Sequence, residues 1–171
     1  MNVPEDLADY KLERAELAIA LPPDWKLDEE SLKDERWYWP IGLLKVLARL
    51  PISNDTWLGF GHTMDKQSPF AEDTELCAAL LVGPQDVVWN GGEVCTLPSS
   101  EEVNFYQVIP LYRNEMEYKM EHDADALLKK MAGISFVVNP TRQNAITRGT
   151  LAEEEFTGDM DDAAWHLESI Q

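Results

Sequence analysis

The stretch ELCAALLV, residues 75–82, is apolar at every position after its first glutamate. An apolar run of this length is typical of a strand that is covered on both faces. We therefore place it in the middle of a sheet that carries other elements on each side. A second strong strand, VNFYQVIPL at 103–111, is predicted to belong to the same sheet.

Weaker strand patterns surround these two segments. Residues 14–21 alternate large and smaller apolar side chains, and the segment TWLGFGHT at 56–63 looks like a strand that two glycines interrupt. The segment 87–97 contains Asn-Gly-Gly between two apolar runs, which favours a hairpin. Residues 134–138 are expected to form a last short strand.

Two helical regions complete the pattern. Pro40 is a favourable first helical residue, and the apolar face that follows it predicts a helix that Pro51 stops. A second helical segment is expected over 114–131, with a new N-cap at Asp123 or Asp125. Strands and helices in this mixed order favour an α+β fold with a mixed, mainly antiparallel sheet flanked by helices.

The chain is predicted to be one domain over residues 1–150, followed by an acidic C-terminal extension over 151–171. That extension contains seven acidic residues and no lysine or arginine. Over the whole chain, 32 acids and 14 bases give a formal net charge of −18. Such a charge repels nucleic acid and anionic lipid, so we expect neither as a partner, and it attracts basic proteins. Solubility alone is an equally good explanation of the composition.

The expected location is the cytoplasm. The N-terminal residues lack the basic and apolar regions of a signal peptide, and no stretch approaches the roughly 20 apolar residues of a membrane span. Two cysteines without a CxxC spacing favour a reducing compartment over a disulfide framework.

Several sequence blocks together resemble the Suppressor of Fused domain family. In order, they are AEL (15–17) with LPPDW (21–25), WPI (39–41) with LLK (43–45) and LARLP (47–51), TWLGFGHT (56–63), LCAALL (76–81), VNFYQVIPLY (103–112), and EME (115–117) with EH (121–122) and ALL (126–128). Asn139-Pro140 also fits. The resemblance covers about residues 10 to 145 and is closest to the short bacterial members.

The resemblance implies stoichiometric protein binding without a known reaction. Animal members hold zinc-finger transcription factors inactive, and several bacterial members are thought to be immunity proteins that neutralise secreted toxins. Two departures bear on the ligand. Only about a dozen residues precede the 15–21 strand, so an edge of the sheet is expected to be open. A tyrosine and an aspartate that the animal proteins use are replaced here by Leu50 and Gly61, so the animal-type ligand is not implied.

Four residues are candidate contacts with a partner: Phe60, His62, Tyr112 and Arg113. Phe60 stands between two glycines and is expected to be exposed, and aromatic side chains dominate interface energies. Tyr112 and Arg113 lie at the predicted corner between strand and helix. A histidine such as His62 more often serves local hydrogen bonding than chemistry.

The function we infer is that of a non-enzymatic module that sequesters or inhibits another protein, such as a basic toxin or effector. We predict no catalytic residue, cofactor or metal, because His62, His122, Cys77 and Cys95 lack zinc-site spacing. The alternative is a thiol- or histidine-dependent hydrolase centred on His62, which requires a cysteine within reach of the imidazole. A third hypothesis is a homo-oligomer assembled through the open sheet edge.

Overall fold

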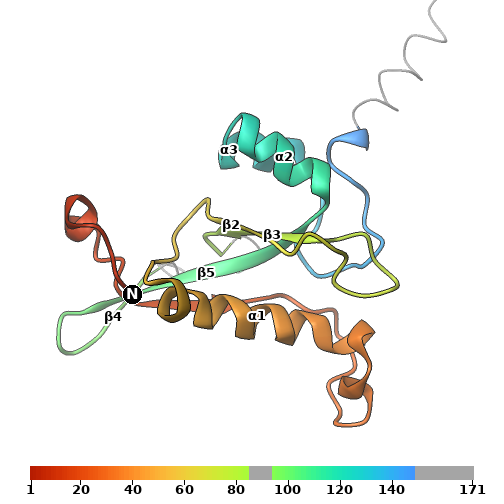
Figure 1. Ribbon diagram of the computed structural model, residues 1–171, viewed down its shortest axis with the longest axis horizontal. Coiled ribbons are helices and arrows are strands. Elements are labelled where there is room, and N and C mark those ends of the chain that lie inside the picture. Colours follow the sequence, from red (N-terminus) through yellow and green to blue (C-terminus); the bar gives the residue numbers. More distant parts are fainter. Residues whose placement is uncertain (85–93, 149–171) are drawn as a thin grey trace, which may run out of the picture.

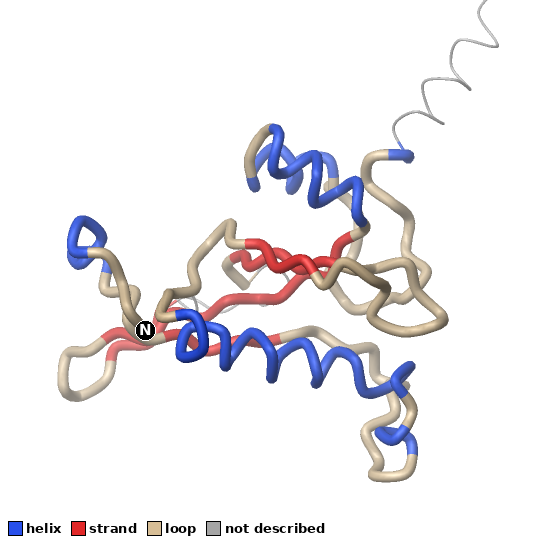
Figure 2. The backbone as a smooth tube through the Cα atoms, viewed as in Figure 1, coloured by secondary structure: helices blue, strands red, loops and turns tan. Residues whose placement is uncertain are grey.

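A computed structural model describes residues 1–84 and 94–148 of the 171-residue chain. A sheet lies between one long helix on one face and two shorter helices on the other (Figure 1, Figure 2). The strands are β1 (Ala15–Ala18), β2 (Thr63–Asp65), β3 (Ala78–Val82), β4 (Val94–Thr96) and β5 (Glu102–Leu111). The helices are the 3-10 turns η1 (Glu5–Tyr10) and η2 (Ser31–Lys33), followed by α1 (Glu35–Asn54), α2 (Arg113–Glu121) and α3 (Ala124–Lys130).

The sheet has the strand order β1-β5-β3-β2, and β4 also pairs with β5. The β1–β5 pair is parallel, whereas β5 with β3, β5 with β4, and β3 with β2 are antiparallel. The predicted α+β fold with a mixed, mainly antiparallel sheet is therefore confirmed. Among the described residues, β1 and β2 each have one hydrogen-bonded neighbour, so both form open edges of the sheet.

All five residues of β3 are buried, as the sequence predicted for 75–82. Ala79 and Leu81 join the core beneath α1, while Leu80 and its alternate neighbours join the core beneath α2 and α3. Successive side chains of a strand point to opposite faces, so one apolar strand contributes to both cores. The helices cover the two faces because each face carries apolar side chains that must leave water.

Helix α1 begins before Pro40 and ends after Pro51, the two residues at which the sequence predicted its ends. The Asp34 side chain caps its start by accepting from the Arg36 N–H at 2.9 Å, which moves the first turn ahead of Pro40. Pro51 lies inside the helix, which ends at Asn54 and is capped by Asp55 in a left-handed conformation with φ of 50°. The prediction that Pro51 stops the helix is thus wrong by three residues, since the last turn forms after the proline ring.

The glycine-rich segment 56–63 is a loop with a turn and not a strand; only Thr63 belongs to β2. Gly61 has a φ of +78°, a left-handed conformation that breaks strand geometry. A Cβ on Gly59 would lie 2.3 Å from a ring carbon of Trp57, so the indole packs directly against this backbone. The two glycines therefore shape a compact loop before β2.

Two other strand predictions differ from the structure. Residues 134–138 form no strand, although the Val138 N–H donates to the Ala20 carbonyl at 2.8 Å. The first half of the hairpin predicted within 87–97 lies outside the described residues. Its second half, β4, forms a hairpin with β5 through a turn in which the Leu97 N–H donates to the Glu101 carbonyl at 2.8 Å.

The helical segment 114–131 divides in two, as the sequence indicated. Asp123 is the cap of α3, where its side chain accepts from the Ala126 N–H at 2.7 Å. The helices α2 and α3 then pack together, and Leu127 of α3 joins Leu80 of β3 in one core.

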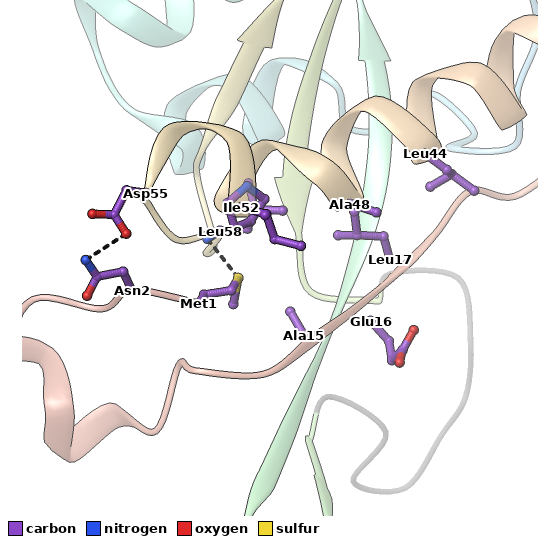
Figure 3. A pocket seen from close by; sticks show the side chains of 11 residues that line it. Met1, Asn2, Ala15, Glu16, Leu17, Leu44, Ala48, Ile52, Asp55 and Leu58 are labelled. Carbon is purple, nitrogen blue, oxygen red and sulfur yellow. Dashed lines mark hydrogen bonds between the residues drawn. The ribbon is translucent and has the colours of Figure 1, made fainter.

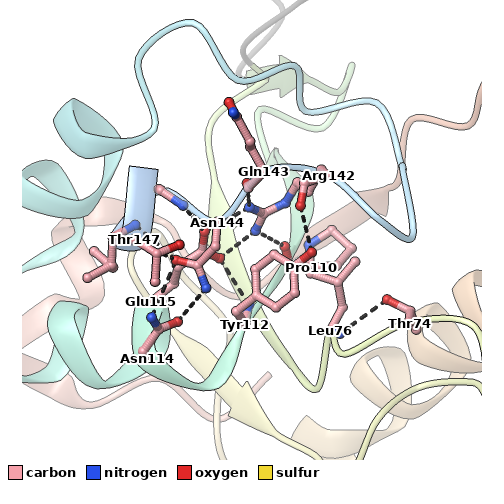
Figure 4. A network of polar contacts seen from close by, with 12 residues as sticks. Thr74, Leu76, Pro110, Tyr112, Asn114, Glu115, Arg142, Gln143, Asn144 and Thr147 are labelled. Atoms are coloured by element: carbon pink, nitrogen blue, oxygen red, sulfur yellow. Dashed lines mark hydrogen bonds and ion pairs between the residues drawn. The ribbon is translucent and has the colours of Figure 1, made fainter. Parts of the chain in front are cut away.

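A buried ion pair between Glu115 and Arg142 links the residues after α3 to the sheet and to α2 (Figure 4). Glu115 is fully buried, and its two carboxylate oxygens accept from the guanidinium of Arg142 at 2.7 and 2.5 Å. The same carboxylate accepts from the backbone N–H groups of Tyr112 and Ala145 at 2.9 and 2.8 Å. Four donors thus satisfy one buried charge, which its desolvation requires.

The Arg142 guanidinium also explains why β5 can contain a proline, Pro110. Arg142 donates to the carbonyl of Pro110 at 2.9 Å. Residue 110 lies beyond the last β1–β5 partner, Gln107, so no strand adjoins β5 there on the β1 side. Since a residue directs its N–H and C=O to the same side of a strand, the missing N–H of Pro110 faces this segment and not β3.

Replacing the buried carboxylate should destabilise the fold strongly. Glu115→Ala leaves the Arg142 guanidinium without its partner, which typically costs about 3–5 kcal/mol. Glu117→Ala, on the exposed side of α2, should change the free energy of unfolding by less than about 0.5 kcal/mol. Urea denaturation followed by circular dichroism measures both. A loss below about 1 kcal/mol for Glu115→Ala would contradict this account of the network.

Candidate functional site at the β2 edge

Within residues 1–84 and 94–148, no strand pairs with the outer edge of β2. The Leu81 N–H donates to the His62 carbonyl and the Lys66 N–H donates to the Cys77 carbonyl, both at 2.9 Å. Alternate residues of a strand direct their backbone groups to opposite sides, so His62 and Lys66 face β3 whereas Thr63 and Asp65 face outward. An outward-facing row of this kind is a template for pairing with another chain.

An apolar groove of about 310 Å³ lies beside this edge. It is bounded by α1, the 56–62 loop, β2 and α2, whose contributions include Leu50, Trp57, His62, Thr63, Lys119 and Met120. Met120 is 66% exposed, and Phe60, next to the groove residue Gly61, is 52% exposed. Large apolar side chains that remain in water beside an open edge mark a surface that can bind a protein.

His62 lines the groove and is half-buried against Trp57. The two ring centroids are 4.3 Å apart. The backbone N–H of His62 donates to the Gly59 carbonyl at 3.1 Å. Burial lowers the pKa of the imidazole below 6.5, and the nearby ammonium of Lys119 lowers it further. A hydrogen bond to the Trp57 backbone opposes this shift. The histidine is therefore held neutral at pH 7.

The other predicted contacts divide between two places. Arg113, the first residue of α2, donates to Asp65 at the end of β2 at 2.5 Å and so lies near the same edge. Tyr112 does not: its hydroxyl donates to the Arg142 carbonyl at 2.6 Å, inside the buried network. Phe60, His62 and Arg113 are thus near β2, and a role in partner binding stays a prediction for all four residues.

Neither cysteine lines the groove that holds His62. Cys77 is buried in front of β3, and burial raises the pKa of its thiol, which keeps it protonated and weakly nucleophilic. Cys95 is exposed on β4. Within residues 1–84 and 94–148, no three metal-ligating side chains come together. The groove is suited to binding and holds no nucleophile–base pair of the thiol type.

Lys119 and Met120 were not identified from the sequence. They belong to α2, about 60 residues after the loop that they face, and only the packing of α2 over the sheet brings them to the groove. No distinct sequence signal pointed to Met120, because α2 also carries Met116 and Tyr118 among its charged residues. No helix in the described part of the chain is long and apolar enough to span a bilayer.

The pKa of His62 should respond to its neighbour. In an NMR titration we expect a value below 6.5 that rises in Lys119→Gln and is unchanged in Lys129→Gln on α3. The unfolded chain takes up this proton at a higher pH than the folded chain. Stability therefore falls as the pH is lowered from about 6.5 through the folded pKa, and this group has no effect above that range. A wild-type pKa at or above 6.5 would contradict the burial argument.

Comparison with known proteins gives a consistent answer. The model of the family described as Suppressor of fused protein (SUFU) matches residues 1–143. No curated protein matches the chain. The crystal structure of Drosophila Suppressor of Fused superposes with a TM-score of 0.58 at 16% identity, over 91% of this chain and 40% of that one.

Two further solved structures are similar. A chain in the Sufu–Fu complex gives a TM-score of 0.56 at 16% identity, over 95% of this chain and 60% of that one. A SUFU homologue from Neisseria gonorrhoeae FA 1090 gives 0.47 at 19% identity, over 63% of this chain and 56% of that one. This chain thus spans between two fifths and three fifths of the first two proteins. The match of the family model over residues 1–143 shows that the chain belongs to the Suppressor of fused (SUFU) family.

Proposed function

We propose that this protein is a non-enzymatic binding module that sequesters or inhibits a partner protein at the β2 edge. The observation that carries the proposal is the open edge of β2 beside an apolar groove that exposed Met120 lines, with exposed Phe60 adjacent in sequence to the groove residue Gly61. A partner strand that pairs with Thr63 and Asp65 would satisfy their outward backbone groups. Its side chains would then enter the groove, as in strand addition generally.

The family supports this function in a general way. One similar structure is a complex of Sufu with Fu, so a longer protein of this fold binds another protein. The resemblance aligns Leu50 and Gly61 with a tyrosine and an aspartate of the animal proteins, and both residues line the groove. A leucine and a glycine offer apolar surface and space where those proteins place a phenol and a carboxylate. The partner of this chain would therefore differ from the animal ligand.

The charge of the protein indicates what kind of partner to expect. A net charge of −18 creates a long-range field that accelerates encounters with basic proteins. At the β2 edge itself, Arg113 neutralises Asp65 and Lys119 lies in the groove. The field would therefore guide the partner, whereas apolar contact and strand pairing would hold it. In its sharpest form, the proposal is an immunity protein that neutralises a basic toxin.

A tagged protein should retain one stoichiometric basic partner from its own cells at low salt. Phe60→Ser should weaken that binding at least about tenfold, because aromatic anchors carry a large share of interface energy. Leu27→Ser is the matched control, since Leu27 is 55% exposed and Phe60 is 52% exposed. The binding constants are measured by titration calorimetry with the purified partner, at low salt and at about 1 M, where the Debye length is about 3 Å.

Three results would count against the proposal. They are no partner at either salt concentration, equal binding by Phe60→Ser and wild type, and equal loss in Leu27→Ser. The salt series separates steering from contact. The affinity of the wild type should fall at high salt while the effect of Phe60→Ser persists, because apolar contact is not screened.

A further inference from the structure

We propose that the opposite edge of the sheet, β1, is a second docking site, and that it takes an extended segment of a protein with alternating apolar and basic residues. This site is separate from the β2 edge and does not depend on what the β2 edge binds. It consists of the outer edge of β1 and a groove between β1 and the C-terminal half of α1.

The backbone of β1 has free positions on its outer side. The Asn104 N–H of β5 donates to the Arg14 carbonyl at 3.0 Å, so residue 14 and its alternate neighbours face β5. Ala15 and Leu17 consequently direct their N–H and C=O groups away from β5. No strand of the described chain pairs with that side. An incoming strand would find the backbone groups of Ala15 and Leu17 at the usual spacing, whereas the outward Glu13 carbonyl already accepts from the Met1 ammonium at 2.7 Å.

A groove of about 600 Å³ runs beside this edge (Figure 3). Leu44, Ala48 and Ile52, which are spaced at i, i+4 and i+8 along α1, face Ala15 and Leu17 of β1 across it. Ile52 is 87% exposed, the most exposed large apolar side chain in the described residues. Alternate side chains of an added strand would enter this groove and cover Ile52.

Charge selects the occupant. Glu16 and Asp55 are the ionisable side chains that line the groove, and both are exposed. One positive group lines the groove, the Met1 ammonium, and it donates to the Glu13 carbonyl. Arg14 and Lys11 nearby are paired with Glu101 and Glu102. Arg49 stands next to Ala48 on α1 but does not line the groove. A strand whose second set of side chains is lysine or arginine would place them beside Glu16, which points away from α1 (Figure 3).

The same charge argues against occupants from this chain. A second copy would bring another net charge of −18 to the edge, and like charges oppose association. The C-terminal residues 151–171 contain seven acids and no base, so they are repelled by Glu16 and Asp55 in the same way. A basic segment of another protein meets both requirements of the site, apolar and electrostatic.

The probe is a fluorescein-labelled ten-residue peptide of alternating valine and lysine, whose binding to the full chain is followed by fluorescence anisotropy. A peptide of alternating valine and glutamate controls for charge. A valine–lysine peptide with an N-methyl group on every amide keeps the charge but cannot donate along either edge. We expect only the first peptide to bind, because it alone combines positive charge with free backbone N–H groups. If the attraction were merely electrostatic, the N-methylated peptide would bind equally well.

Variants locate the peptide. Ala15→Pro removes one outward N–H and blocks the edge without touching the bonds to β5, since proline is tolerated where the N–H faces solvent. It should weaken binding about tenfold, and Glu16→Lys and Ile52→Lys should each do so about fivefold. Thr63→Pro, which blocks the β2 edge in the same manner, is the matched control and should leave peptide affinity unchanged.

Circular dichroism establishes that each variant folds, and if Ala15→Pro does not, the two lysine variants carry the test. The proposal is overturned if the peptide fails to bind at millimolar concentration, if the N-methylated peptide binds equally, or if Thr63→Pro and not Ala15→Pro removes binding. Light scattering supplies the last check: a dimer that Ala15→Pro dissociates would show that a second copy occupies β1. Loss of the natural partner in Phe60→Ser, with peptide binding intact, would separate this site from the β2 edge.

Discussion

Burial of β3 on both faces is the constraint on which the rest of the structure depends. Its five buried residues contribute to two cores, so α1 must cover one face and the α2–α3 pair the other. The helices are amphipathic only weakly, and most of their stability comes from this packing. Because both faces of the sheet are occupied by helices, a partner has access to backbone only at the edges. This is why the two binding surfaces that we propose lie at β1 and β2 and not on a face.

The Glu115–Arg142 pair holds the segment after α3 against the sheet and α2. That segment lacks strand hydrogen bonds, and a buried guanidinium with several acceptors takes their place. A buried pair of this kind contributes little net free energy relative to apolar residues, but breaking it is costly. Its role is therefore to select one path for residues 139–148. Tyr112 belongs to the same arrangement, through a hydroxyl bonded to the Arg142 carbonyl.

Open edges carry a risk of self-association, and the protein limits it in two ways. The exposed edge strands are short, with four residues in β1 and three in β2, so few unpaired groups are available to a second copy. The net charge of −18 adds repulsion between copies. The same charge attracts a basic chain, so it favours hetero-association over homo-association. Avoidance of aggregation and choice of partner thus have one electrostatic cause.

The sequence by itself determined the fold class, the central strand and the renewed cap at Asp123, because each depends on local pattern: apolar residues in succession, or an acceptor before a helical turn. It also identified the family, from blocks spread along the chain. It misplaced the ends of α1 and assigned a strand to 56–63, since Asp34 capping and the close approach of Trp57 to Gly59 are not visible in periodicity. Only the tertiary structure decided that the Tyr112 hydroxyl bonds to the Arg142 carbonyl, that Lys119 and Met120 reach the groove beside His62, and that Ile52 stands exposed beside β1. Those facts depend on which faces meet when the helices close over the sheet, and contacts between residues distant in sequence leave no trace in a local pattern.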